Sequence, residues 1–166
     1  MSKAIIALGS NIEPRLDYLK KAVELISELG KIIRVSSIYE TEPIGFLSKT
    51  NFYNAVLIVE TKKIPIEILE KLKNYEQKIG RKEKTSGMYE SREIDLDIIG
   101  YEQQVIINKK LTVPHPAFRE RRFVLEPLCE IYADWRDPIT QNKASKLLKI
   151  TNDKSQLKKI NFSILQ

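Results

Sequence analysis

The sequence predicts an α+β fold in which an antiparallel sheet packs against two helices. Two segments, 14–29 and 65–79, carry apolar residues at the three-to-four-residue spacing of an amphipathic helix. Short apolar runs rich in isoleucine, valine and aromatic residues, typical of strands, precede, separate and follow these segments. The order strand, helix, strand, strand, helix, strand is that of the ferredoxin-like β-α-β-β-α-β core, an antiparallel sheet with both helices on one face.

The first half of this core begins with a strand expected over residues 3–8, an apolar run after its first residue. A helix is expected to begin near Pro14, because proline is favoured in the first helical turn. It is expected to end at Gly30, because glycine is common at helix C-termini. Residues 31–41 are expected to form one continuous strand, because β-branched side chains are frequent there and an aromatic residue follows them.

The second half of the core follows a loop expected over residues 42–51. Residues 52–61 are expected to form a buried strand. A second helix is expected to begin at Pro65 and to stop at Gly80. Residues 81–91 are polar and basic and include a glycine, so we expect a mobile loop there.

The last strand of the core, expected over residues 92–99, carries the pattern that indicates chemistry. Side chains alternate between the faces of a strand, so Asp95 and Asp97 project from one face and the apolar residues between them from the other. Two like charges this close raise a pKa or recruit a cation, and Mg²⁺ prefers such oxygen ligands. Arg92 could contact the phosphates of a nucleotide held by the ion. The alternative is that both carboxylates form the solvated face of an edge strand.

The remainder of the chain is expected to contain further short elements. These are a hairpin over residues 101–107, a largely helical segment to about residue 131, a turn over 134–138 and a short helix over 143–150. The sequence shows no linker, so we expect residues 1–166 to form a single domain with a short basic C-terminal extension after about residue 142.

The composition excludes several classes of protein. The chain of 166 residues has a net charge of +6, with 42% hydrophobic and 30% charged residues, which favours a soluble globular protein over a disordered or membrane-embedded one. The single cysteine permits no internal disulfide and indicates a reducing cytoplasm. The sequence has no Gly-x-x-x-x-Gly-Lys-Ser/Thr phosphate loop, so a nucleotide would have to be held by side chains and metal.

Several short motifs occur in order over about residues 4–132. They are Ala7-Leu-Gly-Ser-Asn11, Ser36-Ser-Ile-Tyr39-Glu-Thr41, Asn51-Phe-Tyr-Asn54, Glu76-x-x-x-Gly80-Arg81, Arg92-x-x-Asp95-Leu-Asp97, Leu111-Thr-Val-Pro-His115-Pro and Arg121-x-Phe123-Val-Leu-x-Pro127. With this set the chain resembles the 6-hydroxymethyl-7,8-dihydropterin pyrophosphokinase family of folate biosynthesis. It departs from the family pattern before Arg92, where Tyr89-Glu90-Ser91 stand in place of a frequent Trp-Gly-Pro.

The resemblance implies transfer of pyrophosphate from ATP to the hydroxymethyl group of 6-hydroxymethyl-7,8-dihydropterin, with release of AMP. Asp95 and Asp97 would bind two Mg²⁺ ions against the triphosphate. Arg81 and Arg92 would contact phosphate oxygens, for which a guanidinium offers paired donors. These four residues are the catalytic residues that the resemblance implies.

The resemblance also implies which residues surround each substrate. On the nucleotide side they are Glu76, Arg81, Arg92, Ile98, His115 and Arg121. On the pterin side they are Thr41, Pro43, Ile44, Phe52, Asn54 and Phe123. The flat pterin would stack between the two phenylalanine rings, and the asparagine amide would read its polar edge. We expect a cytoplasmic monomer whose partners are these small molecules, with no nucleic acid and no membrane.

The residues alone leave other interpretations open. His115 lies between two prolines and could be a turn residue, and Phe52 and Phe123 could be core aromatics. An RNA-binding domain of the RRM kind has a related fold but places aromatic rings on its central strands, whereas the strand after Tyr53 is mainly aliphatic. Another Mg²⁺-dependent nucleotidyl or phosphoryl transferase could use the same acidic pair.

Overall fold

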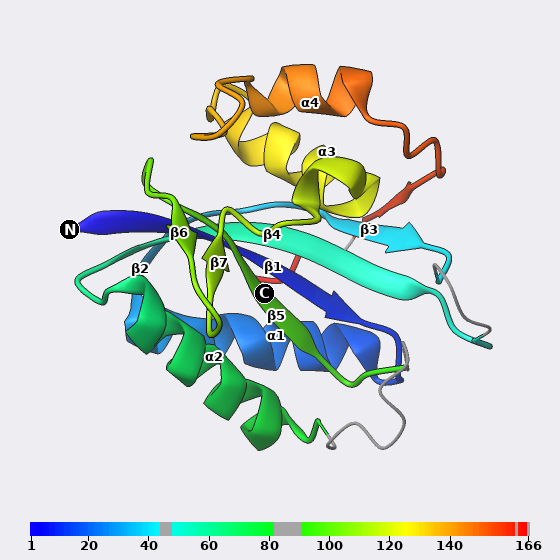
Figure 1. The fold of residues 1–166 in the computed structure, drawn as a ribbon. Coiled ribbons are helices and arrows are strands. Elements are labelled where there is room, and N and C mark those ends of the chain that lie inside the picture. Colours follow the sequence, from blue (N-terminus) through cyan, green and yellow to red (C-terminus); the bar gives the residue numbers. More distant parts are fainter. Residues whose placement is uncertain (44–47, 82–90, 162, 166) are drawn as a thin grey trace.

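The computed structural model in Figure 1 describes residues 1–43, 48–81, 91–161 and 163–165. The core elements are β1 (Ser2–Ser10), α1 (Arg15–Ile26), the 3₁₀ turn η1 (Ser27–Leu29), β2 (Gly30–Val35), β3 (Ile38–Thr41), β4 (Phe52–Thr61), α2 (Pro65–Ile79) and β5 (Asp95–Tyr101). They are followed by β6 (Ile106–Ile107), β7 (Thr112–Val113), the 3₁₀ turn η2 (Phe118–Glu120), α3 (Arg122–Tyr132), α4 (Ala144–Ile150) and β8 (Lys158–Ile160).

One antiparallel sheet organises these elements. Its strands lie in the order β5-β1-β4-β3-β8. β2 pairs with the same edge of β4 as β3 does, farther along that strand. β5 is therefore an edge strand, and its first residue, Asp95, lies opposite Gly9 of β1. Because β4 pairs with the other side of β1, residues at the ends of three strands meet at one end of the sheet.

Helices cover both faces of the sheet (Figure 1). On one face α1 and α2 contribute residues such as Leu19 and Leu72 to a core that includes Leu57 of β4. On the opposite face α3 and α4 form a second core, in which Leu125 packs with Val56. The prediction of an antiparallel ferredoxin-like core with its two helices on one face is confirmed, whereas the second helical layer was not predicted.

Glycine and proline mark the ends of α2 as the sequence indicates. The helix begins at Pro65, with the Glu67 carboxylate accepting a hydrogen bond from the Ile64 backbone N–H at 3.0 Å, and ends at Gly80, whose φ of +116° is a left-handed conformation. Gly30 follows the 3₁₀ turn and opens β2. A Cβ atom on Gly30 would collide with the carbonyl group of Glu60, so only glycine allows β2 to approach β4 this closely.

Residues 31–41, expected as one strand, form two. β2 ends before Ser36 and β3 begins after Ser37, and both strands pair with β4. The Ser36 hydroxyl accepts a hydrogen bond from the Val56 backbone N–H at 2.9 Å, so a side chain replaces a backbone group at the break. The content of β-branched residues could not indicate this interruption, because such residues lie on both sides of it.

The expectation of a hairpin over residues 101–107 was wrong. β5 continues to Tyr101, and β6 pairs instead with β7, because the side chain of Asn108 closes a turn by accepting a hydrogen bond from the Leu111 backbone N–H at 2.9 Å. The segment after residue 142 contains α4 and β8, and β8 pairs with β3 at the second edge of the sheet. Among the described residues, no helix is long and apolar enough to cross a bilayer.

Candidate active site

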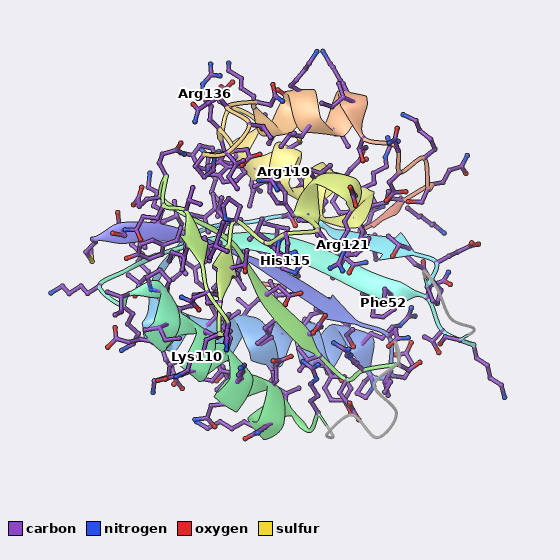
Figure 2. All side chains as sticks on the ribbon, in the orientation of Figure 1. Phe52, Lys110, His115, Arg119, Arg121 and Arg136 are labelled. Atoms are coloured by element: carbon purple, nitrogen blue, oxygen red, sulfur yellow. The ribbon has the colours of Figure 1, made fainter. Side chains whose placement is uncertain are left out.

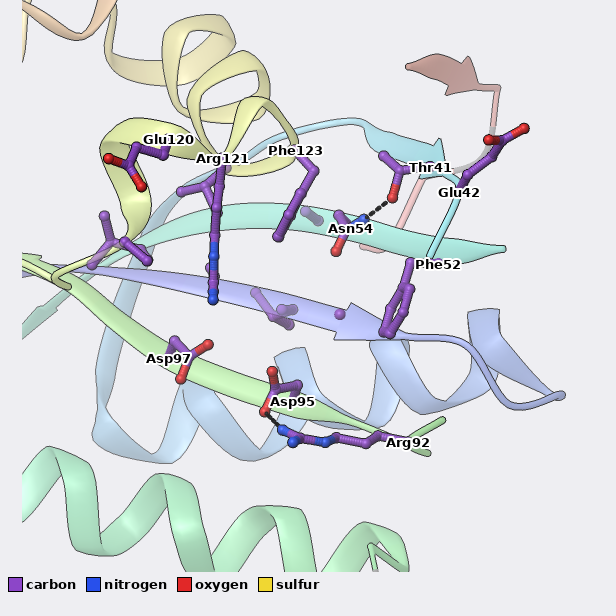
Figure 3. Close-up of a pocket in the computed structure, with 17 residues that line it drawn as sticks. Thr41, Glu42, Phe52, Asn54, Arg92, Asp95, Asp97, Glu120, Arg121 and Phe123 are labelled. Atoms are coloured by element: carbon purple, nitrogen blue, oxygen red, sulfur yellow. Dashed lines mark hydrogen bonds and ion pairs between the residues drawn. The ribbon is translucent and has the colours of Figure 1, made fainter. Parts of the chain in front are cut away.

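A cavity of about 400 Å³ lies between the sheet and the start of α3 (Figure 3). β1, β4 and β5 contribute its floor, the segment 117–124 lies over it, and Thr41 and Glu42 flank it at the end of β3. Such a volume is typical of a small-molecule site. One end of the cavity is acidic and the other is aromatic.

The acidic end is built on β5. Asp95 and Asp97 line the cavity, whereas Leu96 and Ile98 are buried in the core on the other face of the strand, so the predicted alternation is confirmed (Figure 3). Ile98 was expected on the nucleotide side. Because its side chain lies in the core, a contact between Ile98 and a nucleotide would have to involve its backbone.

Two arginines share one oxygen of Asp95. Arg92 Nη1 lies 3.0 Å and Arg81 Nη1 lies 3.1 Å from Asp95 Oδ1. Arg81 is also paired with Glu76, which is buried on α2 and accepts a weak hydrogen bond from the Leu96 backbone N–H at 3.4 Å. Glu76 does not line the cavity and instead joins α2, Arg81 and β5.

Asn11 fixes the backbone of Arg92. The Asn11 side-chain oxygen accepts a hydrogen bond from the Arg92 N–H at 2.6 Å, and the Asn11 N–H donates to the Arg92 carbonyl at 3.1 Å. Asn11 is 1% exposed, so these bonds are shielded from water. Asn11 belongs to one of the sequence motifs, but its role could not be predicted because the pairing spans about eighty residues of chain.

Asp97 occupies an electrostatically unfavourable position. Burial raises the pKa of its carboxyl group and Asp95 raises it further, while the guanidinium groups of Arg121, Arg92 and Arg81 lower it, with a net rise to about 7. A bound cation would favour the charged form of this carboxylate, because it would replace repulsion from Asp95 by attraction. The pair therefore has the electrostatics of a cation site.

His115 is held as a neutral imidazole. Burial lowers its pKa, and the positive charge of Arg121 lowers it further, to about 4. Its Nδ1 atom accepts a hydrogen bond from the Ala117 backbone N–H at 3.1 Å, so the ring proton lies on Nε2. His115 can therefore donate one hydrogen bond from Nε2, as a nucleotide contact would require.

Arg121 precedes α3 and extends across the cavity toward Asp97 (Figure 3). Its Cζ atom lies 5.7 Å from the ring centroid of Phe123. Phe52 and Arg121, both labelled in Figure 2, line the same cavity, so residues that are far apart in sequence meet on one face of the sheet. The guanidinium of Arg121 places a cation between the acidic and aromatic ends.

The aromatic end contains Phe52 of β4 and Phe123 of α3 (Figure 3). Asn54 lies beside them, is 6% exposed, and donates a hydrogen bond from Nδ2 to the Thr41 hydroxyl at 2.9 Å. A Cβ atom on Gly9 would lie 3.0 Å from Asn54 Oδ1, so glycine keeps the space beside this amide open. The arrangement suits a flat heterocycle with a polar edge.

The remaining expected residues lie outside this cavity or outside the described chain. Arg81, His115 and Pro43 are described but do not line the cavity, and Ile44 and most of the basic loop, residues 82–90, lie outside the described residues. Glu42 and Glu120 line the cavity without having been predicted. Their neighbours in sequence, Thr41 and Arg121, were the available signal, but side-chain direction in loops cannot be read from spacing.

The donors at the acidic end suit Mg²⁺. Within the described chain no group of three or more His, Cys, Asp or Glu residues could enclose a metal by itself, so the protein's contribution would be Asp95 and Asp97. Mg²⁺ is commonly held by one or two carboxylates and completes its shell with water and substrate phosphates. The carboxylate oxygens are of the hard type that this ion prefers.

Known proteins are similar to this chain over most of its length. The family model described as 7,8-dihydro-6-hydroxymethylpterin-pyrophosphokinase (HPPK) matches residues 5–133. The 2-amino-4-hydroxy-6-hydroxymethyldihydropteridine pyrophosphokinase of Aquifex aeolicus is 38% identical over 154 residues, which are 90% of this chain and 95% of the relative. The protein of the same name from Bacillus subtilis is 41% identical over 130 residues, 77% of each chain.

Solved structures share the fold. An HPPK-DHPS in complex with substrates has a TM-score of 0.73 at 17% identity, covering 89% of this chain and 43% of that chain. A Plasmodium falciparum HPPK-DHPS with pteroate has a TM-score of 0.72 at 17% identity, with 89% and 42% covered. This chain spans less than half of those longer chains, and the likeness bears on its fold alone.

Proposed function

The chain belongs to the 7,8-dihydro-6-hydroxymethylpterin-pyrophosphokinase family, and from this premise we propose how its cavity serves the two substrates. The protein is an ATP-dependent pyrophosphokinase of folate biosynthesis. It transfers pyrophosphate from ATP to the hydroxymethyl group of 6-hydroxymethyl-7,8-dihydropterin and releases AMP. In this reaction the hydroxymethyl oxygen forms a bond to the β-phosphorus, the bond from that phosphorus to the α,β-bridging oxygen breaks, and the hydroxyl proton passes to solvent.

We propose that Asp95 and Asp97 hold the metal, with two Mg²⁺ ions bound when ATP is present. When bound, magnesium neutralises charge on the triphosphate and helps to align the β-phosphorus with its nucleophile. The support is that both carboxylates line the cavity from one face of an edge strand and that Asp97 has a raised pKa. Two anionic groups held against each other favour a divalent cation.

Arg81 and Arg92 are proposed to contact phosphate oxygens. Arg92 lines the acidic end and Arg81 lies beside it, and both share Asp95 Oδ1. A guanidinium can offer several donors to phosphate. Glu76 would orient Arg81 from behind, since it is buried and paired with it. Arg121 and the neutral His115 would supply further donors on the nucleotide side, so that positioning and charge carry the catalysis.

The aromatic end is proposed to bind the pterin. Phe52 and Phe123 would stack on its two faces, and Asn54, whose amide is fixed by Thr41, would hydrogen-bond to its edge. A fixed amide presents a defined pattern of donor and acceptor, which favours the pterin over a plain aromatic ring. Pro43 and Ile44 stay predictions for the same end of the site.

The observation that carries this proposal is the joining of an acidic end and an aromatic end in one cavity of about 400 Å³. Incubating the purified protein with ATP, Mg²⁺ and the hydroxymethylpterin should produce AMP, detected by chromatography. AMP should not form when EDTA replaces Mg²⁺ or when the pterin is omitted. Formation of ADP in place of AMP would contradict the proposal. Asp95→Ala and Asp97→Ala should each lose most of the turnover, and full activity in both would refute their metal role.

We also propose that residues 1–166 act as a single domain, as a monomer, in the cytoplasm. The described cavity is bounded by strands and a helix of one chain, so a second copy is not needed to complete it. Size-exclusion chromatography with light scattering should give the mass of one chain, 19.2 kDa. A stable dimer at micromolar concentration would contradict the monomer.

A further inference from the structure

We infer that Arg15 is a positioning residue that holds the pterin-stacking ring of Phe52 in place, and this inference rests on the pterin role proposed for Phe52. Arg15 is the first residue of α1 and does not line the cavity. Its side chain is 13% exposed, which is low for an arginine at the start of a helix. Two of the contacts that bury it are with the residues on either side of Phe52.

Arg15 contacts the residue on each side of Phe52. Its Nη1 atom donates a hydrogen bond to the carbonyl oxygen of Asn51 at 2.9 Å, and its Cζ atom lies 3.7 Å from the ring centroid of Tyr53. Tyr53 packs against the core beneath α1, whereas Phe52 and Asn54 line the cavity on the other face of β4. Fixing both neighbours of Phe52 fixes the backbone from which its ring projects.

Two carboxylates hold the Arg15 guanidinium in this orientation. Arg15 Nε lies 2.6 Å from Glu13 Oε1, and Arg15 Nη1 lies 3.6 Å from Glu40 Oε1. Glu40 lies opposite Tyr53 in the β3–β4 pairing and immediately precedes Thr41, the hydroxyl partner of the site asparagine. Arg15 therefore ties the start of α1 to both strands that carry pterin-side residues.

The helix itself does not explain an arginine at this position. A positive charge in the first turn of a helix opposes the helix dipole, which favours acidic residues there. A mostly buried guanidinium also needs its charge and donors satisfied. Arg15 meets this need through Glu13, Asn51 and the face of Tyr53, so the strands and not α1 benefit from its presence.

The test compares Arg15→Met with Arg34→Met. Arg34 is exposed on β2 and also donates from Nη1 to a backbone carbonyl, that of Ile131, at 2.8 Å, so the control loses the same charge and bond type away from the cavity. Arg15→Met should raise KM for the pterin by roughly tenfold, with kcat and KM for ATP changed less than about twofold. Arg34→Met should leave all three constants unchanged. Fluorescence titration of the pterin, with a nonhydrolysable ATP analogue present, should give the same weakening without turnover.

Two further measurements separate positioning from general destabilisation. Tyr53→Leu, which removes the stacking face, should also weaken pterin binding, whereas Tyr53→Phe, which keeps the ring, should not. If Arg15 acts through Phe52, the double variant Arg15→Met/Phe52→Leu should bind the pterin no worse than Phe52→Leu alone. The inference would be overturned if the double variant bound the pterin more weakly than Phe52→Leu by the factor seen in Arg15→Met alone. It would also be overturned if Arg15→Met weakened the binding of ATP and of the pterin equally.

The pterin KM of the single variant Phe52→Leu separates a failure of the positioning role of Arg15 from a failure of the stacking role proposed for Phe52. Phe52→Leu with an unchanged pterin KM would refute the stacking role and remove the basis for Arg15. Phe52→Leu with a raised pterin KM, combined with a normal KM in Arg15→Met, would refute the positioning role alone. Urea unfolding of each variant shows whether the fold is retained under assay conditions.

Discussion

Replacing Asp97 by asparagine should stabilise the metal-free protein while removing most of its activity. Asparagine has nearly the size of aspartate but carries no charge. It therefore avoids the cost of burying a charge and the repulsion from Asp95, the two effects that raise the pKa of the carboxyl group. The same lack of charge weakens a Mg²⁺ site. Stability and activity should therefore change in opposite directions, which is the expected trade-off at a functional site.

The size of the effect follows from the pKa of Asp97, which rises from 3.8 to about 7 in the folded protein. Between these values the folded state binds more protons than the unfolded state, so the stability of the unmodified protein falls as pH rises, and the loss is complete above the folded pKa. At about 1.4 kcal/mol for each unit of pKa, the full loss is at most about 4 kcal/mol. Between about pH 5 and about pH 8 the unmodified protein should therefore lose at most about 3 kcal/mol of its free energy of unfolding.

The assay is urea unfolding followed by circular dichroism at these two pH values, with EDTA present. The stability advantage of Asp97→Asn over the unmodified protein should grow from the lower pH to the higher one. Asp17→Asn makes the same chemical change at an exposed site on α1 and serves as the control. An advantage of equal size at both pH values would refute the electrostatic reasoning, and normal AMP formation by the variant would refute the metal role.

Two other predictions concern His115 and Gly30. His115 is the single histidine, so its NMR signals are unambiguous; they should titrate with a midpoint near 4, because burial and Arg121 lower its pKa, and a midpoint near 6.5 would contradict this environment. Gly30→Ala should lower the free energy of unfolding by about 2–4 kcal/mol, because the new methyl group meets the Glu60 backbone. Gly80→Asn, at an open left-handed position, should cost less than about 1 kcal/mol by the same urea measurement, and equal costs would disprove the steric argument.

Periodicity predicted the core because the responsible interactions are local. The alternation around Asp95 and the bounds of α2 depend on neighbours a few residues apart, and both appear in the structure as expected. The break at Ser36 and the pairing of β6 with β7 depend on single side-chain hydrogen bonds, to which hydrophobic patterns are insensitive. β8 escaped prediction because a three-residue strand has too little pattern to detect.

The candidate site was predictable residue by residue only where a motif identified a residue type with a known chemistry. Phe52, Asn54 and Arg121 were expected on this basis, and the structure brings them to one cavity with the acidic pair. Asn11 and Arg15 could not be assigned roles in advance, because their bonds join segments whose approach depends on the whole fold. Spacing in the sequence carries no information about such contacts.

The position of the acidic pair on an edge strand also bears on the solubility of the protein. An unpaired strand edge offers N–H and C=O groups to strands of other molecules and is a common starting point for aggregation. Here the outer edge of β5 is partly occupied, since Glu76 accepts from the Leu96 N–H at 3.4 Å and the Ile99 carbonyl accepts from the His115 N–H at 3.0 Å. With charged side chains on the same strand, this arrangement opposes pairing of β5 with strands of other molecules.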